Sequence, residues 1–123
     1  MIFTSDPIEF LWHYSTYIDK DKLRARIQKH LEFKTCRILY DEDDLVCAVC
    51  LWNIVDNGKA AHIIDLIFRE DRRKHDLMRK ILVNGMRIWP VKFLIYDRDY
   101  TQDGSNRGRQ RIWSVERFLR RKA

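Results

Sequence analysis

Three groups of side chains in this 123-residue sequence could do chemistry, and the first contains Asp65. Asp65 stands in the apolar stretch HIIDLIF, and an ionisable group among apolar neighbours is a candidate for a functional site. A carboxylate at a strand bulge, or one paired with a nearby arginine, would fit the same position. His62 lies three residues before Asp65. On a regular strand it points to the opposite face, so we expect the two not to form a pair.

The second group is a pair of cysteines. Cys47 and Cys50 have the spacing of zinc ligands, but the sequence has only one further cysteine, Cys36. If the pair lies on a strand, the two side chains point to opposite faces. We therefore expect reduced thiols in a core and no metal site.

The third group is basic and is concentrated in the second half of the chain. Residues 1 to 58 carry seven Lys and Arg against ten Asp and Glu, a net charge of −3. Residues 59 to 123 carry seventeen against eight, a net charge of +9. Such a field attracts phosphate, whether on a cofactor, a nucleic acid or a membrane surface.

One strand–helix–strand unit is predicted to position these residues. Two apolar runs without alternation flank a stretch with apolar residues at intervals of three and four, which predicts a parallel strand pair joined by a helix. The predicted elements are a strand from Ala60 to Phe68, a charged turn from Arg69 to Lys74, a helix from His75 to Trp89 and a strand from Val91 to Asp97.

The residues before this unit predict two helices and a strand hairpin. The helices run from Pro7 to about Ile18 and from Asp21 to about Phe33, and the strands from Cys36 to Tyr40 and from Leu45 to Val55. Asp56-Asn57-Gly58 then supplies a tight hairpin turn. The fold class is therefore α/β (α+β): one domain over residues 1–123, with a central mixed sheet flanked by helices.

The C-terminal segment is basic and allows two structures. Ile112, Val115, Phe118 and Leu119 form a helical stripe, which favours a helix. A short strand through Ile112 and Trp113, with Ser114 capping a final helical turn, fits nearly as well. Its arginines could contact phosphates while aromatic side chains stack on bases, so a nucleic-acid surface is a hypothesis for Arg107, Arg109, Arg111, Arg117, Arg120 and Arg121.

The sequence contains no run of eighteen apolar residues, and its opening MIFTSDPIEF lacks the features of a signal peptide. We therefore expect an intracellular, cytoplasmic protein that does not span a membrane.

The stretch LWNIVDNGKAAHIIDLIFREDRRKHDLMRKILVNGM resembles the core of the GNAT superfamily of acetyl-CoA-dependent N-acetyltransferases. The resemblance extends over roughly Leu45 to Arg98 and implies transfer of an acetyl group from acetyl-CoA to an amine. In that family an Arg/Gln-x-x-Gly-x-Gly/Ala turn and the following helix cradle the cofactor pyrophosphate. The resemblance implies cofactor binding by Leu66, Ile67, Phe68, Arg72, Arg73, Lys74, His75, Asp76 and Leu77.

The segment from Arg72 to Leu77 departs from the family signature because it contains no glycine. Two interpretations remain open. Either basic side chains replace the backbone cradle, or the fold is kept without the cofactor site. Asp76 competes for the positive end of the helix and weakens the first interpretation. The missing glycines and small size would suit a viral or mobile-element protein.

The resemblance also implies catalytic roles. GNAT enzymes often carry a base on the strand that contains Asp65, and they commonly use a tyrosine as the acid. Tyr96 and Tyr100 are the candidates for that acid. The alternative function is a noncatalytic GNAT-like binding module that holds nucleic acid or a protein partner with its basic C-terminal half.

Overall fold

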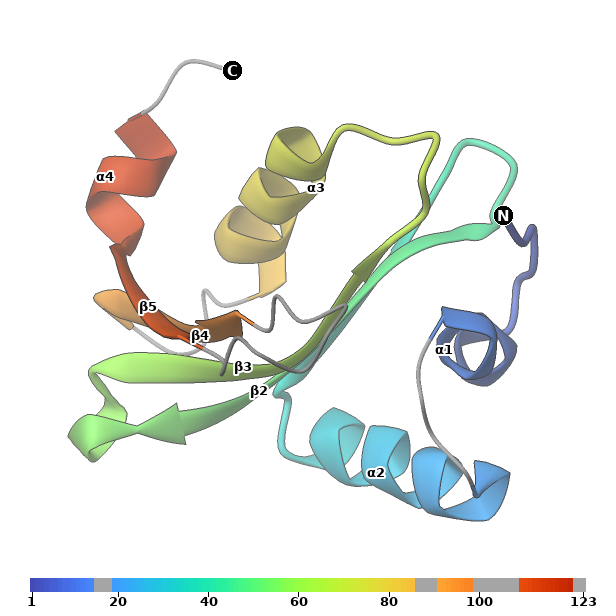
Figure 1. Cartoon of the computed structure of the whole chain (residues 1–123), viewed down its shortest axis with the longest axis horizontal. Coiled ribbons are helices and arrows are strands. Elements are labelled where there is room, and N and C mark those ends of the chain that lie inside the picture. Colours follow the sequence, from blue (N-terminus) through green and yellow to red (C-terminus); the bar gives the residue numbers. More distant parts are fainter. Residues whose placement is uncertain (15–18, 86–90, 99–108, 121–123) are drawn as a thin grey trace.

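The computed structural model describes residues 1–14, 19–85, 91–98 and 109–120. The elements in chain order are α1 (Pro7–Tyr14), α2 (Lys20–Glu32), β1 (Cys36–Tyr40), β2 (Val46–Val55), β3 (Ala60–Phe68), α3 (Lys74–Lys80), β4 (Phe93–Arg98), β5 (Arg109–Ser114) and α4 (Val115–Arg120). The five strands form one sheet in the order β1-β2-β3-β4-β5. Figure 1 shows α1 and α2 on one face of this sheet and α3 and α4 on the other.

Most of the predicted sheet is confirmed. β1 and β3 have the predicted bounds, and β2 begins one residue later than predicted. β2 and β3 form the predicted antiparallel hairpin, and β3 pairs with β4 in parallel. Asp56, Asn57 and Gly58 in the hairpin turn all have positive φ angles, which Asp, Asn and Gly adopt more readily than other residues. The predicted α/β class with a mixed sheet is therefore confirmed.

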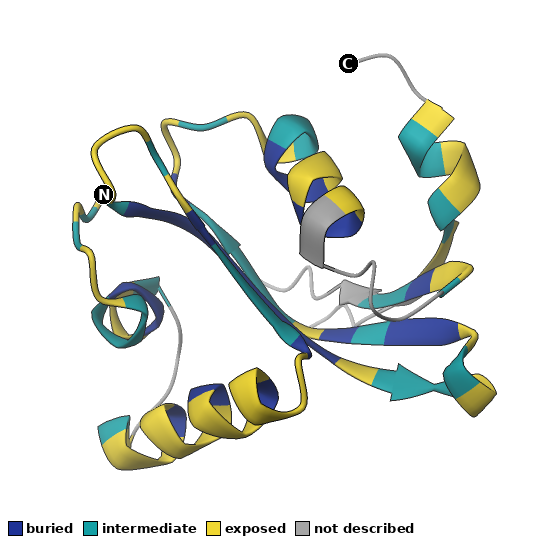
Figure 2. Ribbon diagram, turned by 180° about the vertical axis from the view of Figure 1, so that it is seen from behind, coloured by how far each residue is buried: buried dark blue, intermediate teal, exposed yellow. Residues whose placement is uncertain are grey.

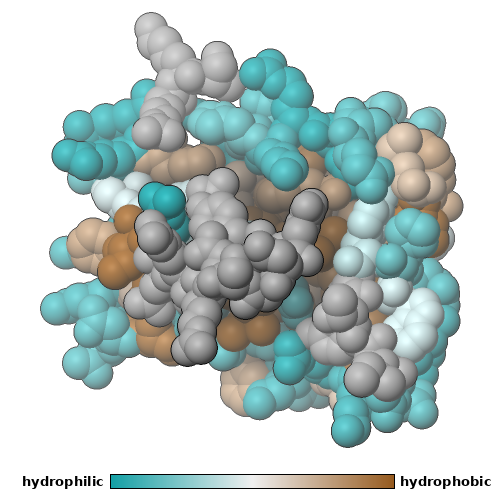
Figure 3. All heavy atoms as spheres, viewed as in Figure 1, coloured by the Kyte–Doolittle hydropathy of each residue, from teal (hydrophilic) through white to brown (hydrophobic). Residues whose placement is uncertain are grey.

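The helices differ from the predictions at their ends. α3 begins one residue earlier than predicted and continues from Ile81 to Gly85 as a π-helical turn. The predicted ends at Ile18 and Trp89 lie outside the described residues. None of the described helices has both the length and the apolar character needed to cross a membrane. Figure 3 shows hydrophilic side chains along much of the margin of the visible face, with apolar side chains gathered between them.

The C-terminal segment follows the second of its two predicted structures, so the favoured continuous helix was wrong. Pairing with β4 holds Ile112 and Trp113 in a strand, opposite Ile95 and Leu94. The Ser114 hydroxyl oxygen then accepts a hydrogen bond from the backbone N–H of Arg117, at 3.3 Å, and caps α4. The helical stripe is kept only from Val115 onward, where three apolar side chains pack on the core: Val115, Phe118 and Leu119.

Two apolar layers enclose the sheet, and both of them cover the buried run of β2. Every residue from Val46 to Trp52 is buried, as expected for a central strand. One layer packs against α1 and α2 and contains Phe10, Leu11, Leu23, Ile27, Val46, Val49 and Leu51. The other packs against α3 and includes Cys50, Trp52, Ala61, Ile63, Leu77, Met78, Ile81 and Leu82. Figure 2 shows the buried residues concentrated in the sheet and on the sides of the helices that face it.

A β-bulge in β2 determines where two cysteines point. Cys47 is an extra residue between two pairs of the ladder with β1 and has no partner there. Because of this insertion, Cys47 and Cys50 both pack into the layer against α3. The prediction that they point to opposite faces was wrong. The thiols are nevertheless free and buried as expected, and burial raises the pKa of both. No cluster of possible metal ligands occurs within the described residues.

Arg69 forms a buried ionic network that joins β3 to the turn between β1 and β2. Its side chain is completely buried and contacts Asp71 at 2.6 Å and Asp41 at 2.7 Å. It also donates a hydrogen bond to the carbonyl oxygen of Val46, at 3.2 Å. The Phe3 ring lies 4.7 Å from the guanidinium carbon and covers the network from the N-terminal segment. The turn from Arg69 to Lys74, predicted only as charged, is therefore anchored in the protein.

We expect Arg69→Met to lower the free energy of unfolding by about 3 kcal/mol, because it removes the buried cation of the network and leaves Asp41 with only the longer contact to Arg72, at 3.6 Å. Urea unfolding followed by circular dichroism measures the change. The matched control is Arg24→Met, which breaks an exposed pair with Asp21 and should change stability by less than about 1 kcal/mol. Equal effects of the two substitutions would contradict a dominant role for the buried network.

The same network predicts a loss of stability in acid. The hydrogen bond from Arg69 lowers the pKa of Asp41 from 3.8 to about 2. The folded state therefore binds this proton less readily than the unfolded state, so the stabilisation is complete above pH 3.8 and declines as the pH falls toward 2.

Urea unfolding at a series of pH values tests this assignment. Asp41→Asn should be less stable than the wild type at neutral pH and should lose less stability between pH 4 and pH 2. The part of the slope that remains is expected from Asp71, whose pKa the Arg69 hydrogen bond also lowers. An unchanged acid slope in Asp41→Asn would show that another group causes it.

Candidate active site

The sheet opens between β3 and β4. Their parallel ladder ends at the pair of Ile63 with Tyr96, although β3 continues to Phe68. On the other edge, β3 stays paired with β2 as far as Phe68. Within the described residues, the β4-facing backbone groups of β3 beyond Ile63 therefore have no strand partner. Such an edge can accept the amide groups of an extended ligand.

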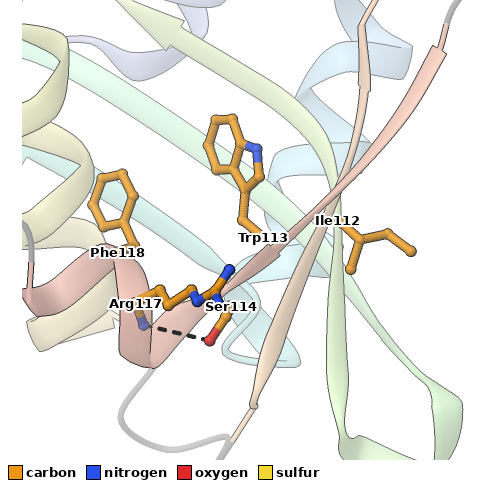
Figure 4. Close-up of a pocket in the computed structure, with 5 residues that line it drawn as sticks. All are labelled: Ile112, Trp113, Ser114, Arg117 and Phe118. Atoms are coloured by element: carbon orange, nitrogen blue, oxygen red, sulfur yellow. Dashed lines mark hydrogen bonds between the residues drawn. The ribbon is translucent and has the colours of Figure 1, made fainter.

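A cavity of about 400 Å³ lies at this opening on the side of α3. Its lining comes from β3, α3, β4, β5 and α4: Leu66, Phe68, Lys74, His75, Met78, Tyr96, Trp113 and Phe118. A hollow of about 490 Å³ shares Trp113 and Phe118 with it and is drawn in Figure 4. The close-up shows Ile112 pointing away from the Trp113 side of β5.

Aromatic rings form a continuous wall of the α3-side cavity. The ring of His75 stacks on Phe118 with centroids 4.9 Å apart, and Phe118 stacks on Trp113 at 6.2 Å. Trp113 lies 6.1 Å from Tyr96, which completes the wall. Both ring nitrogens of His75 are buried and have no hydrogen-bond partner among the described residues. A ligand in the cavity could supply that partner.

The basic turn divides its side chains between two tasks. The Arg72 guanidinium bonds to Glu42 at 2.9 Å and lies 3.6 Å from Asp41, so it extends the buried network of Arg69. This pairing raises the pKa of Arg72. Lys74 and His75 line the α3-side cavity instead. Of the predicted cofactor residues in this turn, these two reach the cavity, whereas Arg72 lines a different hollow.

The start of α3 lacks the glycine cradle of the predicted family but keeps backbone donors. Arg73 occupies the N-cap position, and its side chain makes no capping hydrogen bond. That side chain is exposed and lies 3.6 Å from the carboxylate of Asp76. This ion pair holds the Asp76 carboxylate near Arg73. Asp76 therefore competes less with a phosphate for the positive end of the helix than the sequence predicted. Leu77 is buried in the core.

A second cavity, of about 330 Å³, lies at the same opening. It is lined by His62, Ile63, Ile64, Asp65, Leu66, Ile67 and Tyr96. Leu66 and Tyr96 line both cavities, so these two residues stand between them. The opening of the sheet therefore gives two hollows with common walls, one beside α3 and one along β3 from His62 to Ile67.

Both structural explanations that the sequence allowed for Asp65, a strand bulge and a pair with an arginine, apply in the structure. β3 has a bulge at Ile64, because Ile63 pairs with Trp52 and Asp65 pairs with Leu51. The Asp65 carboxylate also lies 3.7 Å from the guanidinium of Arg26 on α2. The sequence did not indicate Arg26 as this partner, because Arg26 is one of several basic residues on α2.

The bulge also changes the position of His62 relative to Asp65. His62 pairs with Asn53 and Asp65 with Leu51, and these two partners lie on the same face of β2. Both side chains therefore belong to the face covered by α1 and α2, and both line the second cavity. The prediction that they lie on opposite faces was wrong, because it assumed an uninterrupted strand.

Among the remaining predicted site residues, Arg117 lines the hollow of about 490 Å³. Tyr100, Arg107 and Arg121 lie outside the described residues, and Arg109 is the first residue of β5. Arg111 and Arg117 are exposed, while Arg120 pairs with Glu116. Their assignment to nucleic-acid binding stays a prediction. Trp113 and Phe118, two aromatic side chains of this basic segment, line the α3-side cavity, and Phe118 also packs on the core.

Comparison with known proteins identifies the fold. No family model matches the sequence, and no curated protein matches it. Two similar solved structures are chimeras of the spermidine N-acetyltransferase SpeG from Vibrio cholerae and hSSAT. One has a TM-score of 0.63 and 12% sequence identity, and the match covers 93% of each chain. The other has a TM-score of 0.58 and 11% identity, and covers 84% of this chain and 81% of that one. The chain therefore has the GNAT-like fold that its sequence predicted.

Proposed function

We propose that this protein transfers an acetyl group from acetyl-CoA to an amine. The observation that carries the proposal is the opening between β3 and β4, where an unpaired strand edge borders a cavity at the start of α3. Acetyl-CoA would supply the thioester whose acyl carbon the amine attacks. The likeness to spermidine N-acetyltransferase chimeras supports this use of the fold and makes spermidine the first acceptor to test.

The residues around the opening fit an extended cofactor with a charged end. The backbone of Leu66, Ile67 and Phe68 offers hydrogen-bonding groups along the open edge of β3. Lys74 lines the cavity, and Arg73 directly precedes it at the start of α3, so both could approach the pyrophosphate. His75 adds a ring whose two nitrogens have no hydrogen-bond partner in the part of the chain that the structure describes. In this proposal side-chain charge replaces the missing glycine cradle.

The proposed chemistry lies at the boundary between the two cavities. Tyr96 lines both of them and has a phenol that could protonate a leaving thiolate. Asp65 lines the second cavity, where an acceptor amine would stand. Arg72 is assigned a structural role, because its guanidinium is held by Glu42 and Asp41. Tyr100 stays a candidate acid from the sequence.

Calorimetric titration with CoA and with acetyl-CoA tests the cofactor site. We expect saturable binding of both ligands that weakens as salt concentration rises, because the contacts involve phosphate. Arg73→Ala/Lys74→Ala should weaken binding of both ligands by about tenfold or more, because it removes two cations from the proposed pyrophosphate site.

The matched control is Lys22→Ala/Lys29→Ala, which removes the same number of charges from the exposed side of α2. It should leave the affinity nearly unchanged. If both double variants weaken binding equally, the effect comes from net charge and the site is misplaced. If the folded wild type gives no binding heat at several temperatures, the acetyl-CoA proposal fails.

A further inference from the structure

The bulge at Ile64 creates an arrangement that a regular strand could not provide. It brings His62 and Asp65, three residues apart in sequence, to the same face of β3 and into the walls of one cavity. The bulge lies at the point where the ladder between β3 and β4 ends. An imidazole and a carboxylate therefore stand beside the opening that leads toward the α3-side cavity.

The surroundings of Asp65 suit a residue that positions a catalytic base better than they suit the base itself. Its carboxylate has an exposed fraction of 18% and lies 3.7 Å from the Arg26 guanidinium. The Asp65 carboxylate is therefore already engaged in an ion pair with α2. An imidazole, in contrast, takes up and releases protons near neutral pH.

We infer that His62 is the catalytic base of the proposed acetyl transfer and that Asp65 is a positioning residue that acts through it. This inference rests on the proposed function. The acceptor would enter the second cavity as an alkylammonium ion, and His62 would take one proton from its nitrogen. The freed lone pair would form a C–N bond to the acyl carbon, and the nitrogen would then release its second proton to solvent. The C–S bond would break, and the thiolate would take a proton from Tyr96, which regains it from solvent, or from solvent directly.

In this inference the acceptor arrives from the face of β3 that carries His62 and Asp65. His62 and Asp65 belong to the face covered by α1 and α2, whereas Lys74 and His75 line the cavity beside α3. The cofactor and the acceptor would thus meet across the sheet opening, with Leu66 and Tyr96 between their two cavities. This separation leaves the acceptor cavity accessible while the cofactor is bound.

Other groups near His62 could contribute to a pH dependence. Asp65 lies on its own strand, Arg26 and His30 lie on α2, and Asn53 faces it from β2, with Tyr96 on β4. His30 is the other histidine of this set. It is buried against Thr35, and burial lowers its pKa. The test must therefore assign any ionisation to His62 by substitution.

The test measures release of free thiol from acetyl-CoA between pH 5 and pH 9, with spermidine and simple alkyl diamines as acceptors and with water alone. We expect the wild-type rate to rise through one ionisation in the range of an imidazole. His62→Gln should lower kcat at pH 7 by about 100-fold and abolish that ionisation. Asp65→Asn should lower kcat by a smaller factor and leave the KM for acetyl-CoA unchanged, because a positioning residue on this face acts on the base and not on the cofactor site.

Two further measurements separate chemistry from structure. Added imidazole should partly restore the rate of His62→Ala, since a free base can occupy the vacated space. His13→Gln, at an exposed position on α1, is the matched control and should behave as the wild type. Calorimetry should show unchanged acetyl-CoA affinity in all variants at this face.

The outcomes distinguish the inference from the function on which it rests. If the wild type binds no acetyl-CoA, the proposed function fails. If the wild type is active and His62→Gln keeps both its rate and its pH profile, His62 is not the base. If acetyl-CoA binds but thiol is released neither with amines nor with water, the assignment of a base at this opening is overturned as well.

Discussion

The guanidinium of Arg69 lies where the end of β3, the turn between β1 and β2, and the approach to α3 converge. It contacts a carboxylate from each of the two turns and a backbone carbonyl of β2, and Phe3 covers it from outside. A buried arginine of this kind is costly to desolvate and therefore tolerates few alternative arrangements of its partners. Its contacts fix the path by which the chain leaves β3. The start of α3, and with it Lys74 and His75, is set in place beside the opening of the sheet as a consequence.

The sheet opening depends on irregularity in β3 as much as on regular pairing. β3 keeps its partner β2 along its whole length and loses β4 after Ile63. The bulge at Ile64 falls at this same point and rotates the following residues relative to those before it. One inserted residue thus does two things: it ends the regular alternation where β4 departs, and it places His62 and Asp65 beside each other on the α2 face.

The sequence predicted the helices and strands well, but it predicted poorly to which face of the sheet individual side chains point. The turn residues Asp56-Asn57-Gly58 and the buried run of β2 are local signals, and both led to correct elements. A bulge leaves no such signal, because one extra residue changes neither composition nor hydrophobicity. The positions of Cys47 and of His62 were therefore both mispredicted, for the same reason.

Long-range contacts decided two further features. Arg72 looks the same as Arg73 in sequence, and only the folded position of Glu42 separates their roles. Pairing with β4, a long-range contact, decided the C-terminal segment.

The short ladder between β3 and β4 also has a consequence for how the molecule opens. β4, β5 and α4 join the rest of the sheet through a seam of four residue pairs, from Ala60 with Phe93 to Ile63 with Tyr96, and α4 also packs on α3 through the stack of Phe118 on His75. A part held by these few contacts should detach at a lower free energy than the whole protein unfolds. A molecule bound in the gap would contact both sides of the seam and would bind only when it is closed. Occupancy would thus convert two loosely coupled parts into one cooperative unit, with a gain in stability that grows with ligand concentration.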